Sequence, residues 1–358
     1  MQKVVIARPG SHDRLVVEEH PDPVPGPGEV SIAVEAAGVN YADCIVRMGL
    51  YSSAKKLVGW PITPGFEVAG RVQSVGAGVR RVAPGDRVVA VSLFGGYATG
   101  LVVPEHQVFP LPKGLSTAQA AGIPAVYLTA WYALFELVKL RPGMLLLVHS
   151  AAGGVGGALL QLAKIARCTT VGVVGAPHKV EAARALGADF VIDKSSADLW
   201  REAERHAPDG YDVVLDANGI ETLGQGYRHL APGGRLVVYG FATMLPRAKG
   251  RPSYPKLAYD WLRTPRFDPL DMCDANKSVI AFNVSYLFPK TELLREGMEA
   301  IFGWLAEGKV VAPPVTTFPL EQVADAHRAI ESGTTVGKLV LEMPAPVADR
   351  PAVTTASA

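Results

Sequence analysis

A strand-to-helix junction with almost no side chains constrains the fold of this chain more than any other feature. The run LLLVHSAAGGVGGALLQLAK, residues 145–164, begins as a continuous apolar strand and passes through alanines and glycines into a helical pattern. In the helical part, Val155, Ala158, Leu159 and Leu162 share one face. A buried strand that leads directly into such a helix predicts one unit of a parallel sheet.

The turn itself has the spacing of a phosphate-binding loop. Ala151, Gly153 and Gly156 stand where the pattern G-x-G-x-x-G has its small residues. Gly153 would let the backbone approach a pyrophosphate, and Gly156 would let the helix pack closely on its strand. The alternative is a helix that packs tightly for structural reasons alone, but the strand–turn–helix context favours a dinucleotide. The expected phosphate-binding residues are Ala152, Gly153, Gly154, Val155 and Gly156.

The alternation of strand and helix continues after this junction. The runs VGVV, DFVID, YDVVLDA and RLVVYG predict four further strands, with polar helical segments between the first two pairs. After a less regular, aromatic-rich insertion at about 251–269, KSVIAFNVSYL (277–287) is expected to be the last strand. We therefore predict an α/β fold with a doubly wound parallel sheet.

The end of the second strand indicates which dinucleotide is bound. A site for NAD usually has Asp or Glu about 20 residues after the turn, to bind the ribose 2′-hydroxyl. Here VGVV is followed by Gly175, Ala176, Pro177, His178 and Lys179, with no acid, and Lys194 follows the third strand. Lysines attract a 2′-phosphate, so NADP is favoured. The alternative is that both lysines are ordinary solvated surface residues.

The first third of the chain has a different character. Short β-type runs are separated by breakers such as PDPVPGPGE and GAGVRRVAPGD, which suggests a small barrel or sandwich. Strong helix signals begin only near 116–138, and the end of the chain returns to β-structure plus one helix. At 358 residues the chain is long enough for two domains.

Composition excludes several classes of function. The formal net charge of +1 gives no reason to expect nucleic acid or an anionic membrane as partner. The three cysteines are widely separated, which predicts neither a disulfide framework nor a cysteine cluster for zinc. No signal peptide and no transmembrane segment is expected from the hydropathy pattern. These observations lead us to expect a cytoplasmic protein.

Over nearly its whole length the chain resembles the medium-chain dehydrogenase/reductase superfamily. The resemblance is carried by GVNYAD (38–43), PGFEVAG (64–70) and PGDRV (84–88). Many members are zinc alcohol dehydrogenases, with a catalytic cysteine at the position of Asn40 and a Gly-His-Glu motif. Here that motif reads Gly65-Phe66-Glu67, and neither phenylalanine nor an asparagine amide is a good zinc ligand. We therefore expect no metal.

Within the superfamily the chain is similar to the zinc-independent quinone oxidoreductase (zeta-crystallin-like) branch, and in pattern to the vesicle amine transport protein-like group. The signs are Asn40, R-M-G-L-Y (47–51), H-S-A-A-G-G-V-G (149–156) and G-A-P-H-K (175–179). The resemblance implies a discontinuous GroES-like catalytic domain (1–121 and 286–358), a Rossmann NADP-binding domain (122–285) and a homodimer.

The resemblance also implies roles for single residues. Members of this branch bind NADPH, and their 2′-phosphate-binding positions map onto Gly175 and Lys179. Lys194 replaces a tyrosine that commonly assists there, so it keeps a donor but loses the ring. Further cofactor-side positions map onto Thr129, which we expect to open the helix before the nucleotide domain, and onto Asn218, Gly240, Phe241 and Lys338.

The chemistry implied by the resemblance is reduction of a quinone, enone or enal without metal. Such a substrate accepts hydride at carbon while charge develops on its oxygen, so donors are needed there. Asn40 and Tyr51 are the expected donors, Tyr51 could relay a proton, and Asp43 is expected to orient its neighbours. The alternatives are a turn residue for Asn40 and an ordinary half-buried ring for Tyr51.

Two other functions remain open from the sequence. An enoyl-thioester reductase uses the same hydride geometry on a larger substrate, and a basic rim able to hold a phosphopantetheine or coenzyme A would favour it. Lys55 and Lys56 are candidates for such a rim. The second alternative is an NADPH-binding interaction protein with little turnover.

Overall fold

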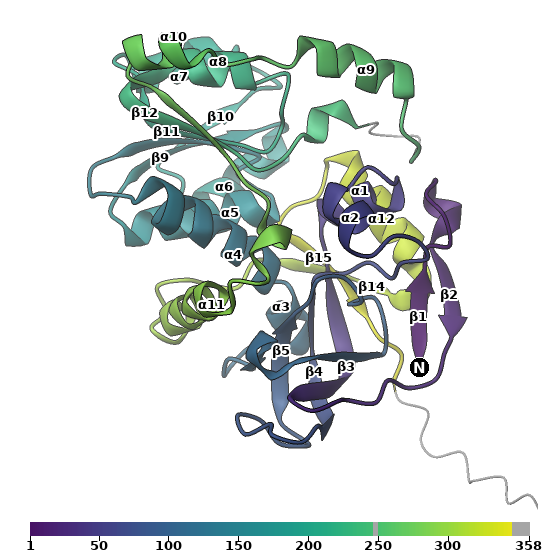
Figure 1. Cartoon of the computed structure of the whole chain (residues 1–358). Helices are drawn as coiled ribbons and strands as arrows, with labels where there is room; N and C mark the ends of the chain where they lie inside the picture. The colour runs from purple at the N-terminus through teal and green to yellow at the C-terminus, as the bar shows by residue number, and fades with distance from the viewer. Residues whose placement is uncertain (246–249, 346–358) are drawn as a thin grey trace, which may run out of the picture.

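Two large sheets organise the chain in the computed structural model, which describes residues 1–245 and 250–345 (Figure 1). A six-stranded sheet lies in the upper part of the figure and a seven-stranded sheet in the lower part. A separate two-stranded ribbon pairs β1 (Gln2–Val5) with β2 (Val16–Glu19).

All neighbouring strands of the six-stranded sheet are parallel, in the order β10-β9-β8-β11-β12-β13. The order reverses between β8 and β11, so the carboxyl ends of these strands form the crevice where such sheets bind ligands. The predicted doubly wound parallel sheet is confirmed. Its strands are β8 (Leu145–His149), β9 (Thr169–Val174), β10 (Phe190–Asp193), β11 (Tyr211–Asp216), β12 (Leu230–Val238) and β13 (Ser278–Ala281).

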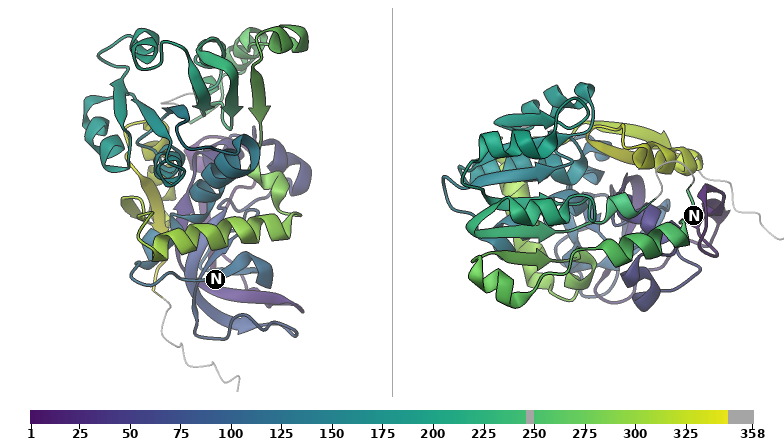
Figure 2. Two further views of the ribbon diagram at one scale, coloured as in Figure 1. Left: turned by 90° about the vertical axis from the view of Figure 1, so that its left-hand side faces the viewer. Right: turned by 90° about the horizontal axis from the view of Figure 1, so that it is seen from above.

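Helices cover both faces of this sheet (Figure 2). Because side chains alternate along a strand, Leu146 and Val148 of β8 join the core on one face and Leu147 joins the core on the other. The first core includes side chains of α5 and α6, and the second includes side chains of α7 and α8. These helices are α5 (Gly154–Ile165), α6 (Val180–Ala185), α7 (Leu199–His206) and α8 (Leu223–Arg228).

The seven-stranded sheet is built around β3 (Glu29–Val39), which pairs antiparallel with β4, β6 and β15. The predicted return of the chain end to β-structure is therefore correct, since β14 and β15 complete this sheet. Its other strands are β4 (Glu67–Val75), β5 (Arg87–Val91), β6 (Gly100–Pro104), β7 (Val108–Pro110), β14 (Val315–Pro319) and β15 (Lys338–Glu342).

The helical prediction was incomplete in three places. Helices α1 (Tyr41–Arg47) and α2 (Ser52–Leu57) precede residue 116, and α11 (Thr291–Ala306) adds a second long helix near the chain end, before α12 (Val323–Ser332). The insertion is more regular than expected, because it contains α9 (Tyr254–Arg263), and α10 (Pro269–Asp274) begins where it ends. Short helices such as α1 escape a periodicity search because tertiary contacts stabilise them.

The connection between the two sheets also contains helices. Here α3 (Thr117–Ala121) and α4 (Pro124–Trp131) are followed by a π-helical segment, η3 (Tyr132–Val138). The predicted last strand is shorter than expected, because only Ser278–Ala281 pairs and η6 (Val284–Leu287) follows it. No helix among the described residues is both long and apolar enough to span a membrane. The remaining short helices are η1 (His12–Arg14), η2 (Glu105–Gln107), η4 (Pro177–Lys179), η5 (Ala242–Met244) and η7 (Leu320–Gln322).

Candidate functional site

Three polar side chains meet between the two sheets, namely the predicted site residues Asn40 and Lys338 together with Glu67. Asn40 directly follows β3, Glu67 begins β4 and Lys338 begins β15, so the register of these strands places the three residues side by side. Lys338 Nζ lies 2.5 Å from Asn40 Oδ1 and 2.6 Å from Glu67 Oε1, and Asn40 Nδ2 donates to Glu67 Oε1 at 2.9 Å. Glu67 also accepts the Ala125 backbone N–H at 2.6 Å.

This triad fixes the orientation of the Asn40 amide. A lysine ammonium can only donate and an ionised carboxylate can only accept, so Oδ1 must face Lys338 and Nδ2 must face Glu67. Glu67 and Lys338 are buried, whereas Asn40 is partly exposed. The Asn40 amide nitrogen carries two hydrogens and gives one to Glu67, and no hydrogen bond engages the other within the described part of the chain.

Asp43 stands behind Asn40 and is wholly buried. Its Oδ2 accepts the Asn40 backbone N–H at 2.8 Å and the Tyr97 hydroxyl at 3.0 Å, and its Oδ1 accepts the Gly65 backbone N–H at 2.8 Å. With every contact directed inward, Asp43 is placed to orient its neighbours rather than to touch a substrate.

Asp43→Asn is expected to remove a pH dependence of stability between about pH 4 and pH 6. Burial raises the pKa of Asp43 from 3.8 to about 6, against the lowering effect of hydrogen bonds from Asn40 and Gly65. The folded protein therefore binds this proton more tightly than the unfolded chain, and the stabilisation is complete below the unfolded pKa and lost as the pH rises through the folded pKa.

Relative to Asp43→Asn, wild type should lose up to about 1.4 kcal/mol of unfolding free energy per pH unit within that window. Chemical denaturation of both proteins from pH 4 to pH 7 measures the difference. A difference that stays constant over this range would contradict a raised pKa at Asp43.

Tyr51 packs against Phe66, the residue that precedes Glu67 of the triad. Its ring packs edge-on against Phe66 and Phe94, with ring centroids 5.9 and 6.3 Å away. Its hydroxyl donates to Asn283 Oδ1 at 3.1 Å and lies 3.0 Å from Ser285 Oγ. Burial raises the pKa of Tyr51. The hydroxyl is therefore bonded across to the η6 segment in this structure, and its role as donor stays a prediction.

The glycine-rich turn has the geometry of a phosphate cradle. Gly153 is the N-cap of α5, and no hydrogen bond engages the N–H groups of Gly154, Val155 and Gly156 in the described part of the chain. A Cβ on Gly156 would lie 2.2 Å from the Ser150 carbonyl oxygen, so close packing requires this glycine. A Cβ on Gly153 would meet only that same oxygen, at 3.2 Å, which leaves the space above its backbone open.

The end of β9 combines an open glycine with nearby lysines. A Cβ on Gly175 would find only Lys194 Cε, 3.7 Å away, so the exposed Lys194 side chain extends past this position. Lys179 instead donates to the Gly333 carbonyl at 2.5 Å, and burial lowers its pKa. The carboxylate of Asp193 is engaged by the N–H and hydroxyl of Ser195. Lys194 is therefore the cation better placed for a 2′-phosphate.

Three more predicted residues gather at the ends of β11 and β12. Asn218 Oδ1 accepts from the Ser150 hydroxyl at 3.2 Å, which joins it to the phosphate turn. A Cβ on Gly240 would lie 2.8 Å from the Ala217 carbonyl oxygen, and the half-exposed Phe241 packs over Gly219.

The expectation for Thr129 is wrong in one respect. This residue lies near the end of α4, which starts at Pro124, rather than at its beginning. Its hydroxyl donates to the Ala125 carbonyl at 2.7 Å, the same residue whose N–H binds Glu67. Thr129 thus lies on the helix that supports the triad.

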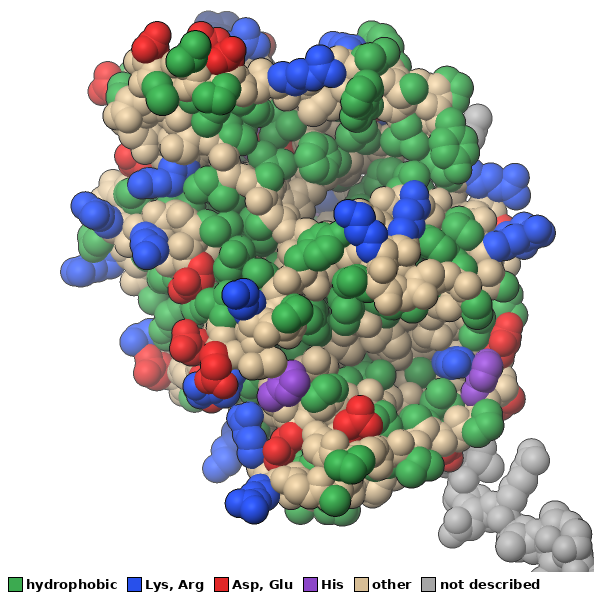
Figure 3. Space-filling model, viewed as in Figure 1, with side chains coloured by type: hydrophobic (Ala, Val, Ile, Leu, Met, Phe, Trp, Pro, Cys, Tyr) green, Lys and Arg blue, Asp and Glu red, His purple; other side chains and the backbone are tan. Residues whose placement is uncertain are grey.

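Backbone contacts bring these groups into one region. The Gly337 N–H donates to the Ala152 carbonyl at 2.9 Å, so the residue before Lys338 is bonded to the phosphate turn. A Cβ on Gly154 would lie 3.6 Å from Lys338 Cδ. The Asn40 triad therefore adjoins the start of α5, and Figure 3 shows the surface hollowed where α1 and α2 face the upper lobe.

A second buried cluster has the composition of a metal site but not its electrostatics. Cys44, His327 and Glu331 place ligand-type atoms within 4.8 Å of one another. The buried guanidinium of Arg47 lies between them, 3.0 Å from His327 Nδ1 and 2.7 Å from Glu331 Oε1. A metal ion would face this fixed positive charge, so the cluster is an internal ion-pair network.

The sequence analysis did not predict that Glu67 would be part of the candidate site. The structure bonds it to two predicted site residues, and the signal available was its retention in Gly65-Phe66-Glu67. Asn283 and Ser285 were also missed, because they lie in a segment expected to be strand. His149, the last residue of β8, is wholly buried against Trp200, with ring centroids 5.8 Å apart.

Two family descriptions match the chain. The alcohol dehydrogenase GroES-like domain matches residues 26–113, and the zinc-binding dehydrogenase family matches residues 186–341. The first match falls on the seven-stranded sheet and the second covers strands of both sheets, and together they confirm the predicted combination of a GroES-like part with a Rossmann-type part. The second name refers to zinc, although Asn40 and Phe66 stand at the expected ligand positions in this chain.

Known proteins match over almost the whole chain. The synaptic vesicle membrane protein VAT-1 homolog of Rattus norvegicus is 34% identical over 93% of this chain and 81% of its own length. The Escherichia coli quinone oxidoreductase complexed with NADPH superposes with a TM-score of 0.82, at 26% identity, over 96% of this chain and all of that one. The CurK enoyl reductase gives a TM-score of 0.83, at 28% identity, over 96% and 99%.

Proposed function

The chain belongs to the medium-chain dehydrogenase/reductase superfamily, in its zinc-independent quinone oxidoreductase branch, and on this premise we propose that it reduces quinones or α,β-unsaturated carbonyl compounds with NADPH. The observation that carries the proposal is the Asn40 amide. Glu67 and Lys338 hold it rigidly, beside the start of α5, with one N–H available. The family matches and the VAT-1 homolog place the chain in a superfamily of oxidoreductases.

The residues present fit NADPH. The free N–H groups at the start of α5 and the open space above Gly153 suit a pyrophosphate. Gly175 leaves room for a ribose phosphate at the end of β9, and Lys194 supplies a positive charge there. Asn218, Gly240 and Phe241 would border the nicotinamide side.

For the proposed reaction the protein must orient the substrate against NADPH and provide one hydrogen-bond donor to the substrate oxygen. Bound NADPH supplies a hydride. Asn40 would bind the carbonyl oxygen through its second N–H and stabilise the charge that develops there. Lys338 at Asn40 Oδ1 polarises the amide and strengthens it as a donor, because the pair is shielded from water. Tyr51 would hold the ring or chain of the substrate through its apolar face.

NADPH oxidation in the presence of EDTA tests the proposed function. The acceptors are phenanthrenequinone, a benzoquinone, an enal and crotonyl-CoA, with NADH as the alternative donor. Turnover of quinone or enal that prefers NADPH and is insensitive to EDTA is expected. Turnover that EDTA abolishes would overturn the proposal, and NADPH binding without any turnover would favour an interaction protein.

Lys194→Glu is expected to weaken NADPH binding about tenfold to a hundredfold and to change NADH binding less than threefold. The physical reason is that a carboxylate at this position repels the 2′-phosphate that only NADPH carries. Titration of intrinsic fluorescence measures both dissociation constants. Lys113→Glu, at an exposed position in the loop after β7, controls for net charge. Equal losses for both cofactors would show that Lys194 does not bind the 2′-phosphate.

We also propose the domain limits and the assembly. Residues 1–121 and 286–358 would form the catalytic domain and residues 122–285 the nucleotide-binding domain, which the division between the two sheets supports. Residues 246–249 and 346–358 of these ranges lie outside the part of the chain that the structure describes. A homodimer is proposed on the family resemblance. Light scattering coupled to gel filtration measures the mass.

A further inference from the structure

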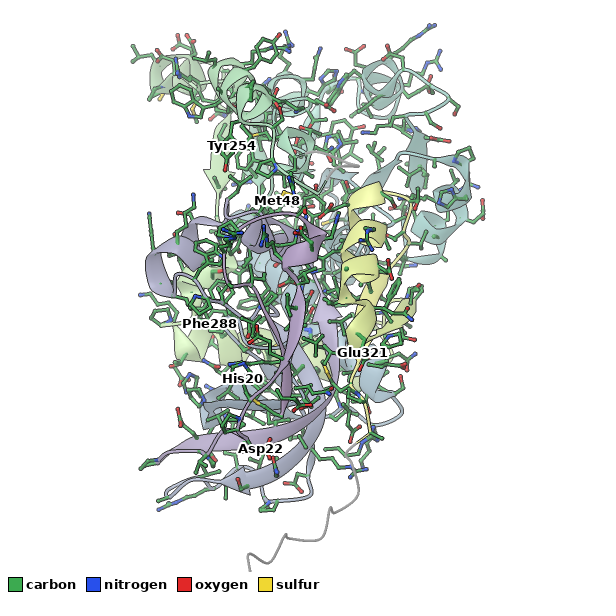
Figure 4. The ribbon with its side chains drawn as sticks, turned by 90° about the vertical axis from the view of Figure 1, so that its right-hand side faces the viewer. His20, Asp22, Met48, Tyr254, Phe288 and Glu321 are labelled. Atoms are coloured by element: carbon green, nitrogen blue, oxygen red, sulfur yellow. The ribbon has the colours of Figure 1, made fainter. Side chains whose placement is uncertain are left out.

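A hollow lined by three arginines lies outside the site described above. Arg8, Ser11 and Arg14 border it from the loop after β1, and Arg251 and Tyr254 border it from the segment that leads into α9. Figure 4 looks onto this side of the molecule and labels Met48 and Tyr254, two residues that line the hollow. The two segments that border the hollow are far apart in sequence, so the hollow exists only in the folded chain.

The buried side chain of Arg47 connects the two segments that border the hollow. Its guanidinium donates to the Gly250 carbonyl at 3.0 Å and to the Gly10 carbonyl at 3.4 Å, and it is paired with Glu331 at 2.7 Å. Arg47 is fully buried. Its charge is already neutralised by Glu331, so it sets the shape of the hollow while the three other arginines set its charge.

The charge of the hollow is only partly compensated. Arg8 and Arg251 form no hydrogen bond or ion pair with any residue that the structure describes. Arg14 folds back over Gly10, and its Nε is buried without a hydrogen-bond partner, with Asp13 Oδ2 3.6 Å away. Asp13 is the nearby acid, so a net positive charge remains. The exposed guanidinium groups of Arg8 and Arg251 would therefore attract an anion to the hollow.

The hollow is connected to the candidate site by the motif R-M-G-L-Y, which the proposed function left largely unused. Met48 lines the hollow, and Tyr51 packs against Phe66 beside the triad. Three residues of chain separate their Cα atoms by at most about 11 Å. Between them, Gly49 has φ of +73°, and a Cβ there would lie 2.6 Å from Pro9. A substrate anchored in the hollow would therefore need a long arm to reach Asn40.

We propose that this hollow binds the phosphate of a substrate carried on a phosphopantetheine-type arm, that is, an enoyl thioester of coenzyme A or of a carrier group. The inference rests on the proposed function and specifies its substrate class. Arginine suits phosphate because its planar fork gives two parallel hydrogen bonds to the oxygens. The arm would extend from the hollow along the R-M-G-L-Y segment towards Tyr51 and the triad.

The variant Arg8→Gln/Arg251→Gln tests the proposal, because both side chains are exposed and their loss leaves no buried partner. For hexenoyl-CoA, KM is expected to rise about tenfold or more with kcat changed less than twofold. For hexenal, and for the hexenoyl thioester of N-acetylcysteamine, which lacks phosphate, KM should not change. The matched control is Arg80→Gln/Arg81→Gln, at exposed positions before β5.

Isothermal titration of free coenzyme A and of inorganic phosphate supplies a readout independent of turnover. Coenzyme A that binds wild type but not Arg8→Gln/Arg251→Gln supports the hollow even if no acceptor is reduced, in which case the proposed function alone fails. If inorganic phosphate binds as tightly as coenzyme A, the proposal that the hollow recognises a carrier arm is wrong. An unchanged KM for hexenoyl-CoA, or an equal rise in the Arg80/Arg81 control, would overturn the site.

Discussion

Lys338→Met is expected to destabilise the protein by about 3–5 kcal/mol, because it removes one partner of a buried ion pair. Lys338 and Glu67 are 3% and 0% exposed, and their charged atoms are 2.6 Å apart. Methionine keeps the length of the side chain but leaves the Glu67 charge in a dry environment, with only the Asn40 amide and the Ala125 N–H as donors. Urea unfolding measures the loss.

Two controls distinguish the effect of breaking the buried ion pair from the effect of replacing a lysine. Lys309 and Glu307 form a pair of the same length, 2.6 Å, but both are more than half exposed, so Lys309→Met should cost no more than about 1 kcal/mol. In Glu67→Gln/Lys338→Met both charges are removed, and most of the stability should return. If the double variant is as unstable as Lys338→Met, packing rather than the unpaired charge causes the loss.

The nucleotide-binding half could be predicted from sequence because its signals are local. A strand of Leu and Val, a turn of small residues and an amphipathic helix lie within 145–164, and each later strand is a short apolar run. The β9 and β11 strands were found for this reason. The order of the strands follows from the few topologies that such units allow.

Helices that depend on tertiary contacts were harder to predict. Helix α1 is seven residues long and buries Asp43 and Arg47, two charged side chains that look like surface residues in the sequence. Their partners, Tyr97 and Glu331, come from distant parts of the chain. A polar residue that is satisfied from so far away leaves no periodic pattern, so both the helix and the ion-pair network become visible only in the fold.

In the candidate site, too, residues with a local sequence signal were predicted, whereas contacts between distant parts of the chain were not. Gly153 and Gly156 were identified by spacing, and their different reasons for being glycine appear in what a Cβ would meet. The link from Lys338 to Asn40 spans 298 residues and depends on β15 pairing with β3. Resemblance placed each residue separately at the site. It did not predict that Glu67 would join them into one hydrogen-bonded unit.

Asn40→Leu is expected to lower kcat for the preferred acceptor by about 10²–10³-fold, the effect of removing one donor to a developing oxyanion. Leucine has nearly the same size, and the pair of Lys338 with Glu67 stays in place, so NADPH affinity should change little. The substrate KM should change less than kcat, because the lost bond strengthens as charge develops.

Steady-state kinetics with NADPH and with NADPH deuterated at the transferred position distinguish the donor role from a structural one. If Asn40 acts on the oxygen, the hydride-transfer step slows and the isotope effect on kcat rises towards its intrinsic value in Asn40→Leu. Asn40→Ser, which keeps a shorter donor, should regain part of the rate. A kcat within threefold of wild type would remove Asn40 from the chemistry and leave Tyr51 as the donor to test.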